Sequence, residues 1–335
     1  MKRIEIVEAL LDNHFGQMPE NKSGGAFAPA NIALCKYWGK RDEELNLPVT
    51  SSLSISLGKR GTKTTLSLLD DPYDQIILNG EKLSSNSPFV IRTVRFLDLF
   101  RPLPEMSFRV ETSSNLPVGA GLASSASGFA ALVLAMNQLF CWNLTKSDLS
   151  ILARLGSGSA TRSLWNGFVK WEKGKAKDGM DSFGEPLDFN WPELCIGILI
   201  VSREPKAIGS RKAMKHTVET SCFYEVWPKK VATDMEMIEQ SLSIKNFDLL
   251  GKTAESNALA MHASMLGAEP PILYALPETI SAVRTIWKMR EEGISVYFTQ
   301  DAGPNLKLLF LKKDEENIKK YFPSIEIIEP FKAIV

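Results

Sequence analysis

Pro117-Val-Gly-Ala-Gly-Leu-Ala-Ser-Ser-Ala126 joins two kinds of sequence: a proline- and glycine-containing turn, and an apolar segment without proline. Pro117, Gly119 and Gly121 disfavour a helix in the first half. Small and apolar residues then continue at helical spacing from Ala123 to Leu139, so we expect a loop that opens onto a long helix. The first backbone N–H groups of a helix lack internal partners and carry positive potential, which favours a bound phosphate.

This loop has a simpler interpretation, an ordinary connection to a serine-capped core helix. Ser124 and Ser125 fit either view, because a serine hydroxyl can cap a helix or bind Mg²⁺ on a nucleotide. The loop lacks the Gly-Lys-Ser/Thr ending of P-loop NTPases, and its glycine spacing does not match the dinucleotide fingerprint.

The charge balance excludes some classes of partner. Lysine plus arginine equals aspartate plus glutamate at 39 each, so there is no global reason to bind nucleic acid or an anionic membrane. The four cysteines show no metal or redox spacing, and the N-terminus is a poor signal peptide. We therefore expect a cytoplasmic protein with free thiols.

The order of elements is mixed along the 335 residues. Antiparallel-type strands alternate with helices in each half, which favours an α+β fold in two layers over a doubly wound parallel sheet. A helix is expected in residues 1–19, with Ile4, Val7, Leu10, Leu11 and Phe15 on one face. The longer expected elements are strands at 47–57, 63–69, 107–112, 194–201, 294–299 and 306–311, and helices at 89–100, 145–155, 229–266 and 275–292.

Asp301 is the carboxylate that draws most attention. It follows an apolar strand and precedes Ala302-Gly-Pro304, where the backbone must turn. Asp301 either orients or deprotonates a substrate hydroxyl, or it caps the turn with its own carboxylate.

Cationic residues form two further candidate sites. Lys36 and Lys40 flank Tyr37 and Trp38, which suits a diphosphate clamp but also an edge strand with solvated lysines. Arg162 lies in a glycine- and serine-rich loop and either grips an anion or forms a surface ion pair. His262 is interpreted as a packed core histidine. Together these residues suggest phosphoryl transfer from a nucleotide to a small anionic substrate.

The glycine loop resembles the phosphate loop of the GHMP superfamily of small-molecule kinases. Four more motifs restrict the resemblance to one family within this superfamily. They are Asn31-Ile-Ala-Leu-Cys-Lys-Tyr-Trp-Gly-Lys-Arg-Asp42, Gly156-Ser-Gly-Ser-Ala-Thr-Arg-Ser-Leu164, Met261-His-Ala-Ser-Met-Leu266 and Asp301-Ala-Gly-Pro-Asn305. In order and spacing these are similar to the diphosphomevalonate decarboxylase family, over about residues 26–330.

The resemblance implies ATP-dependent decarboxylation of (R)-5-diphosphomevalonate to isopentenyl diphosphate, with ADP, phosphate and CO₂ released. It also implies Mg²⁺, a homodimer and a two-domain GHMP-kinase fold whose active site lies in the inter-domain cleft. The expected division is an extension at 1–25, an ATP-binding domain at 26–190 and a C-terminal domain at 191–335.

The resemblance also assigns roles to residues. Asp301 matches the catalytic aspartate, Lys36 a lysine beside the reacting hydroxyl, and Arg162 the arginine that holds the substrate carboxylate. Further substrate contacts are implied for Tyr37, Lys40, Ser157, Gly158, Ser159, Ser210 and Arg211. ATP contacts are implied for Pro117, Gly119, Ala120, Gly121, Leu122, Ala123, Ser124 and Ser125, with Ser125 also the candidate Mg²⁺ ligand.

Three alternatives stay open at this level. Related enzymes act on the 5-monophosphate, and others, such as 3-kinases of mevalonate, phosphorylate without decarboxylating. A non-catalytic nucleotide-binding or scaffold protein would keep the loop but tolerate loss of Asp301. The sequence departs from the family pattern at Thr161, where relatives often carry cysteine, and in the extension before Ala26.

Overall fold

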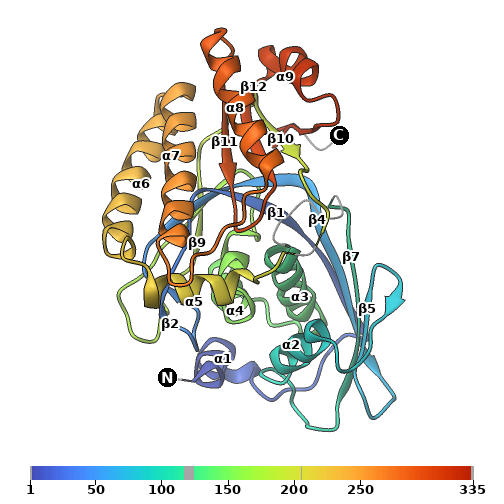
Figure 1. The fold of residues 1–335 in the computed structure, drawn as a ribbon. Helices are drawn as coiled ribbons and strands as arrows, with labels where there is room; N and C mark the ends of the chain where they lie inside the picture. The colour runs from blue at the N-terminus through green and yellow to red at the C-terminus, as the bar shows by residue number, and fades with distance from the viewer. Residues whose placement is uncertain (1, 117–123, 205, 333–335) are drawn as a thin grey trace.

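The computed structural model describes residues 2–116, 124–204 and 206–332. Two sheets lie one above the other, each with its own helices (Figure 1). This arrangement confirms the α+β prediction. Within the described residues, no helix combines the length and the apolar character that crossing a membrane requires.

The first sheet has seven strands in the order β6-β5-β7-β4-β8-β9, with β1 also paired to β4. Its pairings are antiparallel except β5 with β7. The strands are β1 (Ser23–Cys35), β4 (Ser52–Leu69), β5 (Gln75–Leu78), β6 (Glu81–Lys82), β7 (Ser107–Ser114), β8 (Phe168–Trp171) and β9 (Gly184–Leu187). A separate pair is formed by β2 (Lys40–Asp42) and β3 (Leu47–Pro48).

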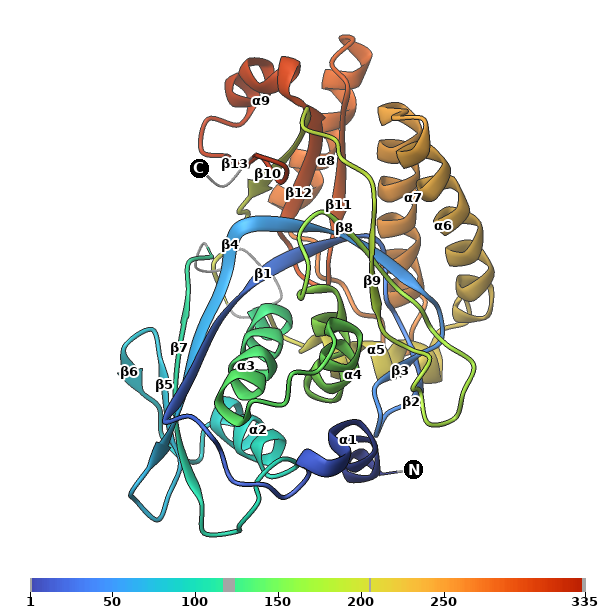
Figure 2. The same cartoon turned by 180° about the vertical axis from the view of Figure 1, so that it is seen from behind.

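The long strands β1 and β4 arch over the helices of this half (Figure 2). The helices are α1 (Arg3–Leu11), η1 (Asp12–His14), α2 (Pro88–Leu97), α3 (Ser124–Phe140), α4 (Lys146–Gly156) and η2 (Gly158–Arg162). Strand β1 and helix α3 approach closely at Gly24, where a β-carbon would lie 2.1 Å from the carbonyl oxygen of Ala135. A glycine is therefore required where α3 packs on the sheet.

The second sheet is antiparallel in the order β11-β12-β10-β13. Its strands are β10 (Leu194–Leu199), β11 (Val296–Gln300), β12 (Leu306–Leu311) and β13 (Glu326–Ile328). The accompanying helices are α5 (Ser210–Thr220), η3 (Tyr224–Val226), α6 (Trp227–Ser243), α7 (Phe247–Leu266), α8 (Pro277–Glu291), η4 (Lys312–Asp314) and α9 (Glu315–Tyr321).

One hydrophobic cluster joins the two sheets. Ile32 and Ile55 of the first sheet share it with Ile196 and Leu309 of the second, and all four are buried. The sheets are therefore held by a common core, which fixes the ends of β1, β11 and β12 relative to one another.

Several expected elements are confirmed with small shifts of their ends, among them α2, α4, α8 and β7. Thr145 caps α4, since its hydroxyl accepts a hydrogen bond from the Asp148 amide at 3.2 Å. The expected strands at 47–57 and 63–69 are wrong as separate elements, because residues 52–69 form the single strand β4. The expected helix at 229–266 is two helices that meet at Ile244–Asn246.

The N-terminal helix differs from its expected face. Ile6, Val7 and Leu11 are the buried residues of α1 and join the core beneath the first sheet, whereas Phe15 is 38% exposed. The helix ends at Leu11, so the 3.6-residue period cannot be extended to Phe15. The first residues therefore belong to the packed body.

Ile6→Ala should lower the free energy of unfolding by about 2–5 kcal/mol, because it leaves a cavity at a fully buried site. Chemical denaturation measures this, and the exposed Glu8→Ala on the same helix is the matched control, with an effect of about 0.5 kcal/mol or less. Equal effects of the two substitutions would show that α1 is not part of the core.

Candidate active site

A cavity of about 470 Å³ lies where the two halves of the chain meet. It brings together residues from every predicted substrate motif. The predicted residues that line it are Lys36, Tyr37, Lys40, Ser125, Ser157, Gly158, Ser159, Arg162, Ser210, Arg211 and Asp301.

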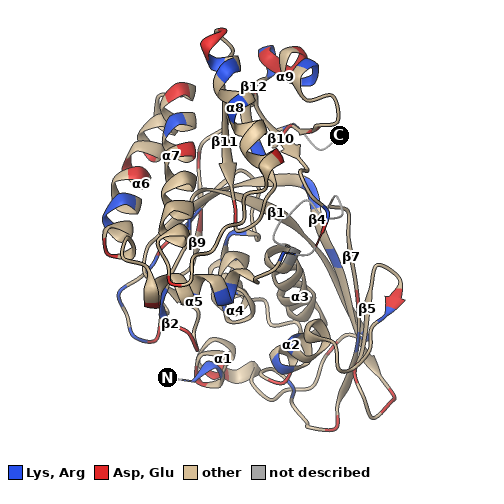
Figure 3. Ribbon diagram, viewed as in Figure 1, with Lys and Arg blue, Asp and Glu red and all other residues tan. Residues whose placement is uncertain are grey.

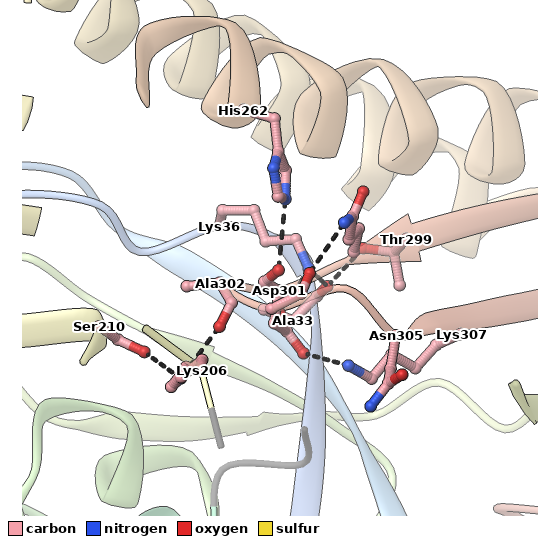
Figure 4. A network of polar contacts seen from close by, with 12 residues as sticks. Ala33, Lys36, Lys206, Ser210, His262, Thr299, Asp301, Ala302, Asn305 and Lys307 are labelled. Carbon is pink, nitrogen blue, oxygen red and sulfur yellow. Dashed lines mark hydrogen bonds and ion pairs between the residues drawn. The ribbon is translucent and has the colours of Figure 1, made fainter. Parts of the chain in front are cut away.

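Asp301 lies directly after β11, with its side chain 30% exposed to the cavity. Its Oδ1 is 2.7 Å from Lys36 Nζ and its Oδ2 is 3.2 Å from Lys307 Nζ (Figure 4). In the described part of the chain, the carboxylate is thus held by two lysines and does not cap its own turn.

These contacts decide the charge of Asp301. Burial by itself raises the pKa of this carboxyl group, but the ammonium groups of Lys36 and Lys307 outweigh burial and hold the pKa well below its usual range. Asp301 is therefore a carboxylate at any pH near neutrality.

Lys36 is buried and is held by contacts with β1, with α7 and with Asp301 after β11. Its Nζ also donates to the Ala33 carbonyl at 2.9 Å, and its backbone N–H donates to Asn257 Oδ1 on α7 at 2.8 Å. Asn257 Nδ2 in turn donates to Asp234 on α6 at 2.8 Å. Burial lowers the pKa of Lys36, while Asp301 acts against that decrease.

His262 on α7 contacts the backbone of Asp301. Its Nε2 is 3.2 Å from the Asp301 carbonyl oxygen. Burial, and next the charge of Lys36, lower the pKa of His262 to about 4, so the ring is neutral and its Nε2–H donates to that carbonyl. His262 therefore supports the backbone of the turn that follows β11.

Arg162 ends η2 and is 2% exposed. Its guanidinium donates to the Ser52 hydroxyl and lies 5.7 Å from the centre of the Trp171 ring. Among the described residues, its Nε has no hydrogen-bond partner and no carboxylate forms an ion pair with the guanidinium. Burial lowers the pKa of Arg162 to about 10. The surface ion-pair interpretation is therefore wrong, and the buried fork suits an anionic ligand.

A second group of cations, Lys40, Arg92 and Arg211, also lines this cavity. Arg92 Nη2 and Arg211 Nη2 both donate to the Gly156 carbonyl, at 2.8 and 2.7 Å. Burial, followed by the charge of Arg211, lowers the pKa of Lys40 to about 8. Converging cations of this kind suit a phosphate group.

Arg92 was not among the residues expected from the sequence. It lies on α2, its Nε has no hydrogen-bond partner among the described residues, and burial lowers its pKa to about 9. No local motif distinguishes Arg92 from Arg95 on the same helix, so only the tertiary structure identifies it.

The substrate loop is shaped by Gly158. A β-carbon there would lie 2.8 Å from Trp171 and 3.0 Å from Tyr37, so glycine allows Tyr37 to pack beside it. Thr161 Oγ1 donates to the Gly158 carbonyl at 2.7 Å, which holds the loop. Ser157 Oγ lies 3.4 Å from Ser159 Oγ and 3.5 Å from Ser125 Oγ.

Ser125 and Arg92 also line a neighbouring cavity of about 320 Å³ between α2, α3 and the first sheet. Other residues of that cavity include Thr64, Phe89, Val110, Phe129 and Leu132. Pro117, Gly119, Ala120, Gly121, Leu122 and Ala123 lie outside the described residues, as does the side chain of Ser124, the first residue of α3. Ser210 is the first residue of α5, and its hydroxyl accepts a hydrogen bond from Lys206 Nζ at 2.8 Å.

Comparison with known proteins relates this geometry to a family. Residues 28–184 match the model of the diphosphomevalonate decarboxylase-like N-terminal domain, and residues 196–332 match that of the mevalonate 5-diphosphate decarboxylase C-terminal domain. The diphosphomevalonate decarboxylase of Aspergillus fumigatus is 38% identical over 310 residues, which is 86% of this chain and 77% of that protein.

Solved structures relate this chain to the same family. The mevalonate diphosphate decarboxylase of Staphylococcus aureus superposes with a TM-score of 0.86 at 38% identity, covering 92% of this chain and 95% of that one. A complex of MDDEF with MVAPP, AMPPCP and magnesium superposes with a TM-score of 0.84 at 40% identity, covering 92% and 99%.

The fold is thus the two-domain α+β fold of the GHMP-kinase type, with the candidate site between its halves. Within that class, the two matched family models together cover most of the chain. The chain belongs to the diphosphomevalonate decarboxylase family.

The pKa of His262 predicts a pH dependence of stability. Between pH 6.5 and about 4 the unfolded chain binds a proton that the folded chain does not, so this contribution to stability is present above pH 6.5 and is lost as the pH falls. His262→Gln, which can still donate to Asp301, should weaken the fall in unfolding free energy over this window. Denaturation at several pH values measures it, with His14→Gln as control; an unchanged pH dependence in His262→Gln would contradict the assignment.

Proposed function

We propose that this chain catalyses the ATP-dependent decarboxylation of (R)-5-diphosphomevalonate to isopentenyl diphosphate, with release of ADP, phosphate and CO₂. One observation carries the proposal: a lysine-held carboxylate, Asp301, and a buried arginine without a carboxylate partner, Arg162, face the same cation-rich cavity. This arrangement suits a substrate that carries a hydroxyl, a carboxylate and a diphosphate.

ATP and Mg²⁺ belong to the reaction of this family, and the residues present fit them. The N-terminus of α3 faces the site, where backbone N–H groups and the helix dipole stabilise phosphate. We place the nucleotide there, with its base toward the neighbouring cavity that Phe89 and Phe129 line. Mg²⁺ keeps several waters and is held largely by phosphates, so the Ser125 hydroxyl is a sufficient protein ligand. When bound, Mg²⁺ would neutralise negative charge on the phosphates.

Asp301 is assigned to the first step. Its carboxylate accepts a hydrogen bond from the tertiary 3-hydroxyl and orients that oxygen toward the γ-phosphorus. The new O–P bond forms as the bond to ADP breaks, and the hydroxyl, made acidic by phosphorus, passes its proton to Asp301. Because Lys36 and Lys307 lower the basicity of the carboxylate, orientation is its main contribution.

Arg162 is assigned to the second step. The C3–O bond breaks with phosphate leaving, positive charge develops at C3, and the electrons of the C1–C2 bond form the C2=C3 double bond as CO₂ departs. Arg162 holds the substrate carboxylate away from C3, so that its own charge does not oppose the developing cation.

The diphosphate is assigned to Tyr37, Lys40 and Arg211, together with Arg92. Tyr37 Oη and Arg92 Nε are buried without hydrogen-bond partners among the described residues, so both are available to a ligand. This number of donors supports a diphosphate over a monophosphate, which needs fewer.

Three further assignments complete the proposal. The chain works in the cytoplasm, divides at residues 25/26 and 190/191, and forms a homodimer. Apolar side chains exposed on α6, α7 and α8, including Met237, Leu259 and Trp287, support association. Size-exclusion chromatography with light scattering tests it, and a monomer at micromolar concentration would contradict it.

The reaction itself is tested by supplying 5-diphosphomevalonate and ATP and following ADP and CO₂ together. We expect equal amounts of both products. ADP without CO₂ would identify a kinase, and activity only with the 5-monophosphate would identify the alternative substrate.

Asp301→Asn should lower kcat by about 10² to 10⁴, because the amide cannot accept the proton and holds the hydroxyl less well. Asp188→Asn, at an exposed position far along the chain from this motif, is the matched control and should retain wild-type activity. Turnover of Asp301→Asn near the wild-type value would refute the role of Asp301.

Arg162→Lys should lower kcat/KM by about 10- to 100-fold, because a single ammonium cannot replace a planar fork that makes two charged hydrogen bonds. Arg109→Lys, an exposed arginine paired with Glu111, is the control. If Arg162→Lys kept full activity, the substrate carboxylate would have to bind elsewhere.

A further inference from the structure

Lys307 is a buried cation to which the reaction assigns no step. It lies in β12, between Thr299 of β11 and Ile198 of β10 in the sheet register, and its side chain is 1% exposed. Its Nζ is 3.2 Å from Asp301 Oδ2, on the carboxylate oxygen that Lys36 does not contact (Figure 4).

Stability does not account for this lysine. Asp301 already has a partner in Lys36, at 2.7 Å, and the three side chains together carry one net positive charge in a largely buried site. Removing an ammonium group from water is costly, and an apolar side chain of similar length would fill the space without that cost.

The geometry of the three charges indicates what Lys307 does. One ammonium contacts each carboxylate oxygen, so the carboxylate cannot rotate to pair both oxygens with Lys36. The lone pairs not used by the lysines are then left for the cavity, toward which 30% of the side chain is exposed. We propose that Lys307 is a positioning residue that fixes the plane of the Asp301 carboxylate, so that its free lone pairs meet the substrate hydroxyl.

This inference rests on the proposed function, because it gives Asp301 the task of holding the hydroxyl. Other charged or titratable groups also face Asp301. Lys36 reaches it from the end of β1, and neutral His262 on α7 contacts its carbonyl. Lys206, in the segment before α5, donates to the neighbouring Ala302 carbonyl at 2.9 Å. Arg162 of η2 adds a further positive charge. Lys307 is the group on β12 that acts on Oδ2.

Removing Lys307 has a consequence that a packing role would not produce. Burial, which by itself raises the pKa of Asp301, would then be opposed chiefly by Lys36. An opposite charge at this distance lowers the pKa of a carboxyl group by about 1 to 3, so loss of Lys307 should raise the titration midpoint of Asp301 by about that amount.

The test is a ¹³C NMR titration of the full chain labelled at aspartate carboxyl carbons, with the Asp301 signal assigned from Asp301→Asn. In Lys307→Met the midpoint of Asp301 should rise by about 1 to 3 pH units, and in Lys307→Arg it should stay near the wild-type position. Lys312→Met, which removes a lysine paired with Glu315 and Glu329, is the matched control and should leave it unchanged.

Kinetics provide the second readout. Lys307→Met should lower kcat by about 10- to 100-fold with little change in KM for 5-diphosphomevalonate, because the substrate still binds but its hydroxyl is misplaced. The acid limb of its kcat/KM profile should move to higher pH with the NMR midpoint. The titration needs no turnover, so it tests the role of Lys307 independently of catalysis. Failure of the wild-type chain to release CO₂ would refute the proposed function and leave the titration result valid.

An unchanged Asp301 midpoint in folded Lys307→Met, or wild-type kcat, would overturn the inference. Circular dichroism checks folding, and Lys307→Gln replaces Lys307→Met if the latter does not fold. Loss of folding in both variants would assign Lys307 a structural role instead.

Discussion

The carboxylate of Asp301, held between two buried ammonium groups, is the interaction on which the site depends. Lys36 comes from the end of β1 in the first sheet, and Lys307 comes from β12 in the second. The Ala33 carbonyl accepts from both Lys36 Nζ and Thr299 Oγ1, so the same contacts that orient the carboxylate also join the two sheets. Burial strengthens these interactions, because little water screens them.

The site concentrates positive charge in a chain whose total charge is balanced. Outer helices such as α6 and α9 carry both basic and acidic residues (Figure 3). The described lining of the cavity has Asp301 as its carboxylate, and its cations are Lys36, Lys40, Arg92, Arg162, Arg211 and Lys212. Burial lowers the pKa of several of these cations, so a bound polyanion would relieve the electrostatic cost of bringing them together.

Local signals in the sequence predicted the elements that depend on neighbouring residues. Thr145 before a helix and the apolar period of α8 are examples. Prediction failed where distant contacts decide. Residues 52–69 remain one strand because β1, β7 and β8 all pair with it, and Ile6 of α1 is buried by the helices beneath the first sheet. The sequence did not predict roles for Arg92 and Lys307, because the residues next to them in the chain form no motif that distinguishes them.

The sequence alone determined the α+β class, the order of the motifs and the residue types that resemble a diphosphomevalonate decarboxylase, since these depend on spacing along the chain. Only the tertiary structure decided which charges meet. Lys36 and Asp301 are 265 residues apart, and only the surroundings of Arg162 show that no carboxylate of the described residues pairs with it. Pairing and burial are properties of space, because both the Coulomb energy and the cost of desolvation depend on distances that sequence separation does not encode.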